Sequence, residues 1–238
     1  MKRYVVLDIE TTGTHPIRNE IIEIGAVYVE DGQVVKTFNE MICPNEPISE
    51  YITGITGIDD TMVADAPPIE EVLPRFIEFC KDAPLVGHNI ILFDYRMLKA
   101  KAVALGFEFD RLGVDTLIIS RAMLKELPSR KLGALCEHYQ ITLENAHRAF
   151  DDAYATYELY RHLENNFAHK APKLFVPEPM IWEVPKWEPI TQKQKKYLQS
   201  LCMAHQIQLE MNVESLSKSE ASKLIDKIIS EHGRLISC

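Results

Sequence analysis

The fold of this chain is decided by residues 4–13, Tyr4-Val-Val-Leu-Asp8-Ile-Glu10-Thr-Thr-Gly13, a short apolar run that ends in two acids. An apolar run rich in β-branched residues is typical of a buried strand. Side chains alternate along a strand, so Asp8 and Glu10 should face one side about 6.5–7 Å apart. Ile9 should then face the core.

Two carboxylates at the end of an apolar strand repel each other and lose hydration. A divalent cation bound between them would remove both costs, and hard oxygen ligands favour Mg²⁺ or Mn²⁺. Gly13 allows a sharp turn or the close approach of a ligand. The alternative interpretation is a strand that runs out into solvent with two hydrated acids.

Composition predicts an ordinary globular protein. The 238 residues are 46% hydrophobic and 26% charged, enough for one substantial domain and a smaller one. No apolar run approaches the ~20 residues that span a bilayer, and the first apolar segment is too short for a signal peptide. The five scattered cysteines form no Cys-x-x-Cys pair, which favours reduced thiols, a cytoplasmic location and no zinc site.

Charge is unevenly distributed. Residues 1–168 hold 16 Lys and Arg against 27 Asp and Glu, a net of −11, whereas residues 190–238 hold 7 against 5, a net of +2. The larger part therefore lacks the basic surface of a protein that grips long duplex DNA. An acidic metal site acting on a chain end is compatible with this charge.

The order of elements predicts a mixed sheet with helices on both faces. Two β-rich runs flank Asp31-Gly32, which is a hairpin signal, and Gly25 in the first run marks a bulge or a close backbone approach. Alternating strand and helix patterns follow, with Asn89 as the expected cap of one helix. Asp94 and Asp152 should lie in first helical turns, and His147 just ahead of a helix.

Strand ends and the helix starts that follow them are where α/β sheets build sites, so Asp8, Glu10, Asp94 and Asp152 are candidates for one site with His147. Asp94 and Asp152 have an ordinary alternative as first-turn acids favoured by the helix dipole. A single histidine is more often a packing or surface residue. The sequence pattern alone leaves these alternatives open.

Three segments are expected. Residues 1–168 should form the main domain, and residues 169–189, with five prolines, Trp182 and Trp187, a linker. Residues 190–238 should form a two-helix module, because the patterns Thr191-x-x-Gln194 and Ser217-x-x-Glu220 are capping boxes ahead of apolar stripes.

Four motifs resemble the DEDDh 3′–5′ exonucleases in order and spacing: Asp8-Ile-Glu10-Thr-Thr-Gly, Ile22-Glu-Ile-Gly-Ala-Val, Gly87-His-Asn89-x-x-x-Phe93-Asp94 and His147-x-Ala-x-x-Asp152-Ala. The segment Ile52-Thr-Gly-Ile is also similar to that family. The likeness is greatest to the epsilon proofreading subunits of bacterial DNA polymerase III and to the exonuclease domains of polymerase C, and it covers about residues 1–168. It implies a ribonuclease H-like fold, α/β with a mixed five-stranded sheet flanked by helices.

The resemblance also implies a site. It makes Asp8, Glu10, Asp94 and Asp152 the ligands of two Mg²⁺ or Mn²⁺ ions, with His147 and Glu10 as catalytic residues. The residues expected to contact substrate are Ile9, Thr11, Thr12, Gly13, Thr14, His88, Asn89 and Phe93. Two departures from the family pattern are visible, since Thr14 and Phe150 stand where the family often has leucine. Thr14 puts in question how the terminal nucleotide is held.

The expected function is removal of nucleotides from single-stranded or frayed DNA 3′ ends, in proofreading or repair in trans to a polymerase. An RNA or oligonucleotide exonuclease of the same family is one alternative, and a non-catalytic protein that binds nucleic-acid ends is another. Residues 169–238 are the expected contact for a DNA polymerase or another replication protein. No membrane association is expected.

Overall fold

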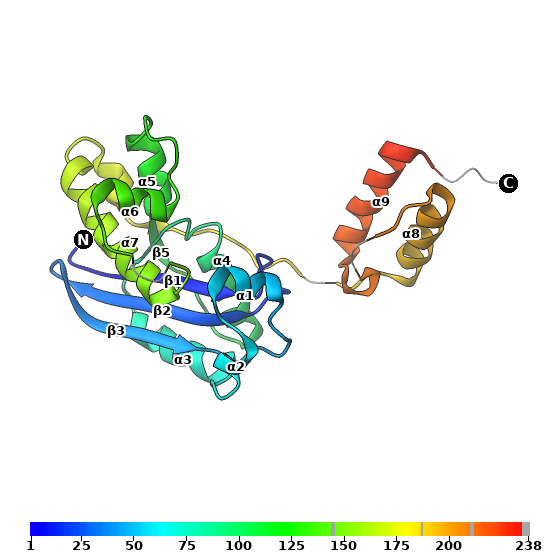
Figure 1. Ribbon diagram of the computed structural model, residues 1–238, viewed down its shortest axis with the longest axis horizontal. Coiled ribbons are helices and arrows are strands. Elements are labelled where there is room, and N and C mark those ends of the chain that lie inside the picture. The colour runs from blue at the N-terminus through cyan, green and yellow to red at the C-terminus, as the bar shows by residue number, and fades with distance from the viewer. Residues whose placement is uncertain (144–145, 187, 210–211, 235–238) are drawn as a thin grey trace. The chain divides into compact units, whose positions relative to one another are not determined.

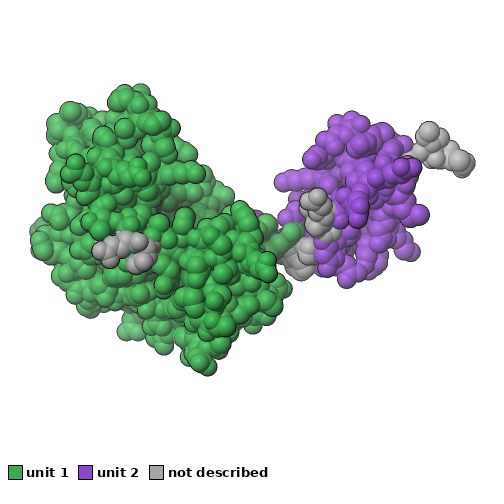
Figure 2. All heavy atoms as spheres, in the orientation of Figure 1, with its two compact units in different colours: residues 1–184 green, residues 185–238 purple. Residues whose placement is uncertain are grey.

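A computed structural model describes residues 1–143, 146–186, 188–209 and 212–234. The chain divides into two compact units, Met1–Val184 and Pro185–Cys238, which are coloured separately in Figure 2. Each unit has its own hydrophobic core and is described by itself. Within the described residues, no helix combines the length and apolar character needed to cross a membrane.

The first unit is built on a mixed six-stranded sheet in the order β3-β2-β1-β4-β5-β6 (Figure 1). The strands are β1 (Arg3–Thr11), β2 (Ile21–Glu30), β3 (Gln33–Met41), β4 (Leu85–Gly87), β5 (Leu112–Asp115) and β6 (Glu178–Pro179). Strands β1 to β3 are antiparallel neighbours, whereas β1, β4 and β5 run parallel. The prediction of five strands is wrong by one: β6 adds an antiparallel edge strand. Its proline is tolerated there because an edge strand leaves one side unpaired.

Helices cover both faces of this sheet, as predicted. The elements are α1 (Glu50–Thr56), α2 (Asp60–Val63), α3 (Ile69–Cys80), α4 (Asp94–Ala104), α5 (Thr116–Met123), α6 (Leu132–Tyr139) and α7 (Ala149–Phe167). Helices α3 and α4 pack on one face, and α5, α6 and α7 pack on the other (Figure 1). Helices α1 and α2 form a small separate cluster around Ile22 of β2.

The predicted hairpin joins β2 to β3. Asp31 and Gly32 have φ of 46° and 77°, the left-handed pair that a tight two-residue turn requires. The predicted cap at Asn89 is wrong, because α4 begins five residues later and Phe93 occupies its N-cap position. Asn89 instead has φ of 71° and begins a separate turn, in which its carbonyl accepts from the amides of Leu92 and Phe93.

The proline-rich segment is not a linker over its whole length. Residues 172–182 form a strap on the first unit that contains the 3₁₀ helix η1 (Pro172–Phe175) and β6. Phe175 is buried in the core under α7, and Met180 is buried in the core under α4. The prolines prevent a continuous α-helix over this segment, but they allow a short 3₁₀ turn that begins at Pro172 and extended chain that packs through its other side chains. Trp187, the second tryptophan of the expected linker, lies outside the described residues.

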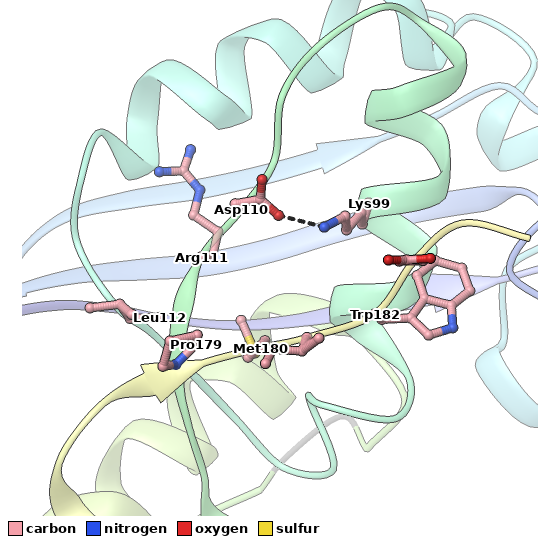
Figure 3. Close-up of a pocket in the computed structure, with 9 residues that line it drawn as sticks. Lys99, Asp110, Arg111, Leu112, Pro179, Met180 and Trp182 are labelled. Carbon is pink, nitrogen blue, oxygen red and sulfur yellow. Dashed lines mark hydrogen bonds and ion pairs between the residues drawn. The ribbon is translucent and has the colours of Figure 1, made fainter.

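The strap borders a surface pocket that Figure 3 shows. Lys99 and Asp110 form an ion pair beside it, at 2.5 Å, and Met180 and Trp182 lie along the strap. The guanidinium of Arg96 lies 5.8 Å from the ring centre of Trp182, so the strap also contacts helix α4. The lining residues of this pocket include none of the predicted catalytic residues.

The second unit is the predicted helical module. It contains α8 (Gln192–His205), the 3₁₀ helix η2 (Val213–Ser215) and α9 (Lys218–His232). Both predicted capping boxes are present, at Thr191 and at Ser217. The module has a core of its own, formed by Leu198, Leu201, Leu216, Ala221, Ile225 and Ile228.

Candidate active site

Strand β1 presents Asp8 and Glu10 on one face, as the alternation of side chains predicts. The earlier residues of that face, Tyr4 and Val6, lie in the core under α7. Ile9 points the other way, into the core under α3 and α4, and is 3% exposed. The side chain of Glu10 is 9% exposed, so the strand carries its acids to the margin of the core rather than into open solvent.

Asp94 is the first residue of α4 and is 2% exposed. Its carboxylate is near β1, because its charge is the strongest electrostatic influence on Asp8. Within the described residues, its buried Oδ1 atom has no hydrogen-bond partner. A buried, unpaired carboxylate oxygen is costly unless a cation or a proton accompanies it.

Helix α7 brings in His147 and Asp152. Asp152 lies in the first turn, and its Oδ2 accepts a hydrogen bond from the backbone amide of His147 at 3.0 Å. His147 is exposed and has φ of 67°, in the left-handed region that a residue with a side chain seldom occupies. Ligand atoms of Glu10, His147 and Asp152 all lie within 4.8 Å of one another.

Burial raises the pKa values of all four acids, and repulsion from the other members of the group adds to the rise at Asp8 and Glu10. Burial raises the pKa of Asp8 well above its ordinary value, and the carboxylate of Asp94 is the next cause. Burial raises the pKa of Glu10 to about 8, with Asp152 adding to the rise. It raises the pKa of Asp94 to about 7 and also raises the pKa of Asp152. The site thus favours a proton or a cation over four free charges.

This donor set fits divalent metal ions. The unpaired Oδ1 of Asp94 and the group of Glu10, His147 and Asp152 supply mainly carboxylate oxygens, the ligands that Mg²⁺ and Mn²⁺ prefer. Asp8 belongs to the same electrostatic cluster, because the charges of Asp94 and Asp152 both act on it. The observed geometry therefore matches a metal centre more closely than a row of hydrated surface acids.

Comparison with known proteins identifies this unit. Residues 5–160 match the family model of the RNase T type, described as Exonuclease. The chain belongs to this exonuclease family. The matched region contains all four acids and His147, and the DEDDh type expected from the motifs is confirmed.

Similar sequences occur in DNA polymerase III of the PolC type. The chain is 48% identical over 157 residues to the PolC-type DNA polymerase III of Caldanaerobacter subterraneus subsp. tengcongensis and 41% identical over 158 residues to that of Clostridium perfringens. Each match covers 66% of this chain and 11% of the polymerase. The chain thus spans about a tenth of the length of these relatives.

Solved structures show the same fold. Exonuclease X in complex with 5′ overhanging duplex DNA has a TM-score of 0.58 and 28% identity, and the match covers 73% of this chain and 97% of that one. The zinc-bound form of the E. coli ExoI–ssDNA complex has a TM-score of 0.65 and 20% identity, covering 74% of this chain and 42% of that one. The expectation of a ribonuclease H-like class is confirmed.

The predicted substrate-binding residues after β1 form a tight loop in the exonuclease domain. Thr11 Oγ1 donates to the carbonyl of Gly13 at 2.7 Å, and Thr12 Oγ1 accepts from the amide of Glu20. A Cβ atom on Gly13 would lie 2.7 Å from the end of the Asn19 side chain, so a larger residue here would have to displace Asn19. Thr14 is exposed, whereas the side chain of Ile9 lies in the core. Substrate contact at these residues stays a prediction.

The second predicted substrate-binding group follows β4. Both ring nitrogens of His88 have internal partners, Thr116 Oγ1 at 2.9 Å and the carbonyl of Arg130 at 2.8 Å. Burial lowers the pKa of His88, so the neutral ring is favoured and the side chain ties β4 to its neighbours. Phe93 is partly buried against the core under α4. Contact of these residues and Asn89 with substrate also stays a prediction.

Two buried acids near the site were missed by sequence reasoning. Asp115, at the end of β5, accepts hydrogen bonds from the amides of Asn89 and Leu117 and so fixes the turn ahead of α4. Glu23 lies in β2 and is 1% exposed. An acid inside an otherwise apolar strand was the available signal for both, because such a residue needs a partner when buried.

Proposed function

We propose that residues 1–184 form a metal-dependent 3′–5′ exonuclease that releases nucleotides from single-stranded or frayed DNA ends. The observation that carries this proposal is the convergence of Glu10, His147 and Asp152, whose ligand atoms lie within 4.8 Å of one another. The buried carboxylate of Asp94 and the neighbouring Asp8 complete an acidic centre. Membership in the exonuclease family supports a hydrolytic rather than a purely structural role.

Asp8, Glu10, Asp94 and Asp152 would hold two Mg²⁺ or Mn²⁺ ions. When bound, such ions neutralise charge on the scissile phosphate and assist nucleophile and leaving group. His147 is exposed at the mouth of the site and is held by its amide to Asp152, so its imidazole is placed to take the proton of the attacking water. Without metal, the negative charge of the surrounding carboxylates would repel a phosphate. A phosphate should therefore bind only when metal ions neutralise that charge.

A DNA end is the proposed substrate. Exonuclease X, at 28% identity, was solved with 5′ overhanging duplex DNA, and the relatives of higher identity are DNA polymerases. A role in proofreading or repair in trans to a polymerase is consistent with these relatives. Hydrolysis of RNA by the same site and non-catalytic binding of ends are the alternatives that an assay must separate.

The test is release of mononucleotides from 5′-labelled DNA and RNA oligomers of one sequence, with Mg²⁺, with Mn²⁺ and with EDTA. We expect stepwise shortening of single-stranded DNA from the 3′ end, abolished by EDTA. The DNA substrates should include recessed and mismatched ends. Faster shortening of RNA would transfer the proposal to an RNA exonuclease, and metal-dependent binding without shortening would identify an end-binding protein.

We propose that the second unit targets the enzyme to a polymerase or another replication protein. It is a separately packed module that carries Lys193, Lys195, Lys196, Lys218, Lys223 and Lys227 in its two helices. Pull-down with residues 185–238 is the direct test. If the module instead tethers nucleic acid, its removal should weaken cleavage of long primer-templates only, with a shallower salt dependence. If removal of the module changed the cleavage of neither short nor long substrates, and the module captured no replication protein, both roles would be refuted.

A further inference from the structure

An ion pair between the buried Glu23 and the partly exposed Arg148 lies at the start of α7. Glu23 of β2 is 1% exposed, and its carboxylate accepts hydrogen bonds from Arg148 Nε at 3.2 Å and Nη2 at 2.7 Å. The same carboxylate accepts from the backbone amide of Ala149 at 3.0 Å. The carboxylate thus forms a bidentate ion pair with the guanidinium. It also accepts a hydrogen bond from one of the backbone amides that have no partner within the helix at its start.

Gly25 makes this contact sterically possible. A Cβ atom at Gly25 would lie 2.1 Å from the backbone nitrogen of Phe150 and 2.2 Å from the carbonyl carbon of Ala149. Those atoms are backbone and cannot move aside without moving α7. The first turn of α7 therefore rests directly on β2, two residues beyond Glu23 along the strand.

The groups held by this contact belong to the active site. Arg148 is the N-cap residue of α7 and immediately follows His147, whose φ of 67° is unfavourable for a residue with a side chain. The amide of Asp152 donates to the carbonyl of Arg148 at 3.0 Å, which starts the helix. On the sheet side, Glu23 is the direct cross-strand partner of Glu10.

We propose that Glu23 and Arg148 are positioning residues that hold His147 and Asp152 against Glu10. The inference rests on the proposed nuclease function for its activity readout, but not for its metal-binding readout. No side-chain hydrogen bond from the N-cap residue Arg148 fixes the start of α7. The ion pair and the hydrogen bond from the Ala149 amide to Glu23 fix it instead. Because one partner sits on β2 and the other follows His147, the pair couples the two halves of the site.

Two other roles are compatible with the contacts and are separated by the test. Arg148 is partly exposed, so it could contact a substrate phosphate, in which case its loss would raise KM. The pair could also serve stability alone. Removing Arg148 alone leaves the buried carboxylate of Glu23 unpaired, which destabilises a protein strongly, whereas removing both members is far less costly.

The experiment compares Arg148→Met, Glu23→Met and the double variant with wild type, and uses Arg75→Met as a control. Arg75 forms a comparable 2.8 Å ion pair with Glu40 on the other side of the sheet, where both groups are more exposed. The measurements are Tm, kcat and KM on a DNA oligomer, and the Kd of Mn²⁺ by titration. The single variants should have a lower Tm, and the double variant should recover most of it.

If the pair positions the site, the double variant should keep a kcat reduced about 10–100-fold and an Mn²⁺ affinity weakened by a similar factor, the usual effect of removing the support of a metal ligand. KM should change less than about twofold. Arg148→Lys should restore part of kcat. Recovery of kcat and Mn²⁺ affinity together with Tm would show a purely structural pair, and a raised KM with unchanged Mn²⁺ affinity would show a phosphate contact. If wild type binds Mn²⁺ but cleaves nothing, the proposed function fails while the affinity series still tests the pair.

Discussion

Single residues in this site are held in an unfavourable electrostatic state. Glu10 and Asp94 are almost fully buried, and their pKa values are raised to about 8 and about 7. The same burial that raises these values prepares the carboxylates to bind cations, since a divalent ion removes the repulsion. Under the proposed function, the stability of the metal-free protein and the activity of the metal-bound protein therefore oppose each other at these residues.

Asp94→Asn should abolish hydrolysis and raise the stability of the metal-free protein. The substitution removes a ligand oxygen charge and also the buried carboxylate whose Oδ1 has no partner within the described residues. Activity on a labelled oligomer and Tm in EDTA measure the two effects. Turnover near that of wild type would remove Asp94 from the site.

The stability of the metal-free protein should fall as pH rises. The folded pKa of Glu10, about 8, lies above its ordinary value of 4.5, so the folded state holds a proton that the unfolded state releases. The contribution of Glu10 to stability is therefore fully present below about pH 4.5 and is lost as the pH rises toward 8. Glu10→Gln should reduce this loss and raise Tm at pH 8 by about 2–4 °C for each ~1 kcal/mol recovered.

Tm in EDTA from pH 5 to pH 8.5 measures this effect. The exposed Glu46 supplies a matched control, and Glu46→Gln should follow wild type over the whole range. Parallel curves for wild type and Glu10→Gln would show that Glu10 carries no such proton.

His147→Ala should lower kcat by about 10²–10⁴, the usual contribution of a general base. His147 contacts Asp152 through its backbone amide, which alanine also provides, so the fold should be retained. Single-turnover cleavage of a labelled oligomer at saturating metal measures the effect. A kcat equal to that of wild type would show that the proton of the attacking water leaves by another route.

At the scale of elements, the site depends on how closely α7 approaches β2. Gly25→Ala places a methyl group 2.1 Å from the backbone of Phe150, so helix and strand must separate. We expect a loss of about 2–3 kcal/mol in the free energy of unfolding, as for an overpacked core, together with loss of activity. Denaturant unfolding measures the first effect.

Gly133→Ala is the control for this substitution. Gly133 lies in helix α6, and a Cβ atom there meets nothing within 4 Å. It should be neutral or stabilising by up to about 1 kcal/mol, because alanine favours a helix over glycine. Equal stability of Gly25→Ala and wild type would show that α7 does not need this contact.

At the scale of the whole molecule, the strap defines where the catalytic unit ends. A chain that ends at Phe167 lacks Phe175 and Met180, each of which is buried in a different core. Burial of such a side chain is worth about 1.5–3 kcal/mol, so this truncation should cost about 3–6 kcal/mol. A chain that ends at Val184 keeps both side chains. It should match the full chain in Tm of the catalytic unit and in cleavage of short oligomers.

Thermal unfolding and oligomer cleavage of the two truncated chains decide the boundary. Equal stability and activity of the two truncated chains would support the expected boundary at residue 168. The strap would then contribute nothing to the stability of the catalytic unit. Loss in the shorter chain alone would extend the catalytic unit to residue 184.

Local sequence determined those features that depend on near neighbours. The alternation of β1 placed Asp8 and Glu10 together, Asp31-Gly32 formed its turn, and Thr191 and Ser217 cap their helices as predicted. Strand period, turn conformation and capping are properties of a few adjacent residues, so they can be read without knowing the rest of the fold.

Only the tertiary structure decided the features that join distant parts of the chain. The partners of Glu23 are more than a hundred residues away, and His88 is held by groups after β5 and ahead of α6. The strap could not be predicted from the sequence, because prolines indicate only which regular structure a segment cannot form. They do not indicate which residues its side chains pack against. Packing of distant surfaces depends on shape and burial across the whole unit, which no local pattern contains.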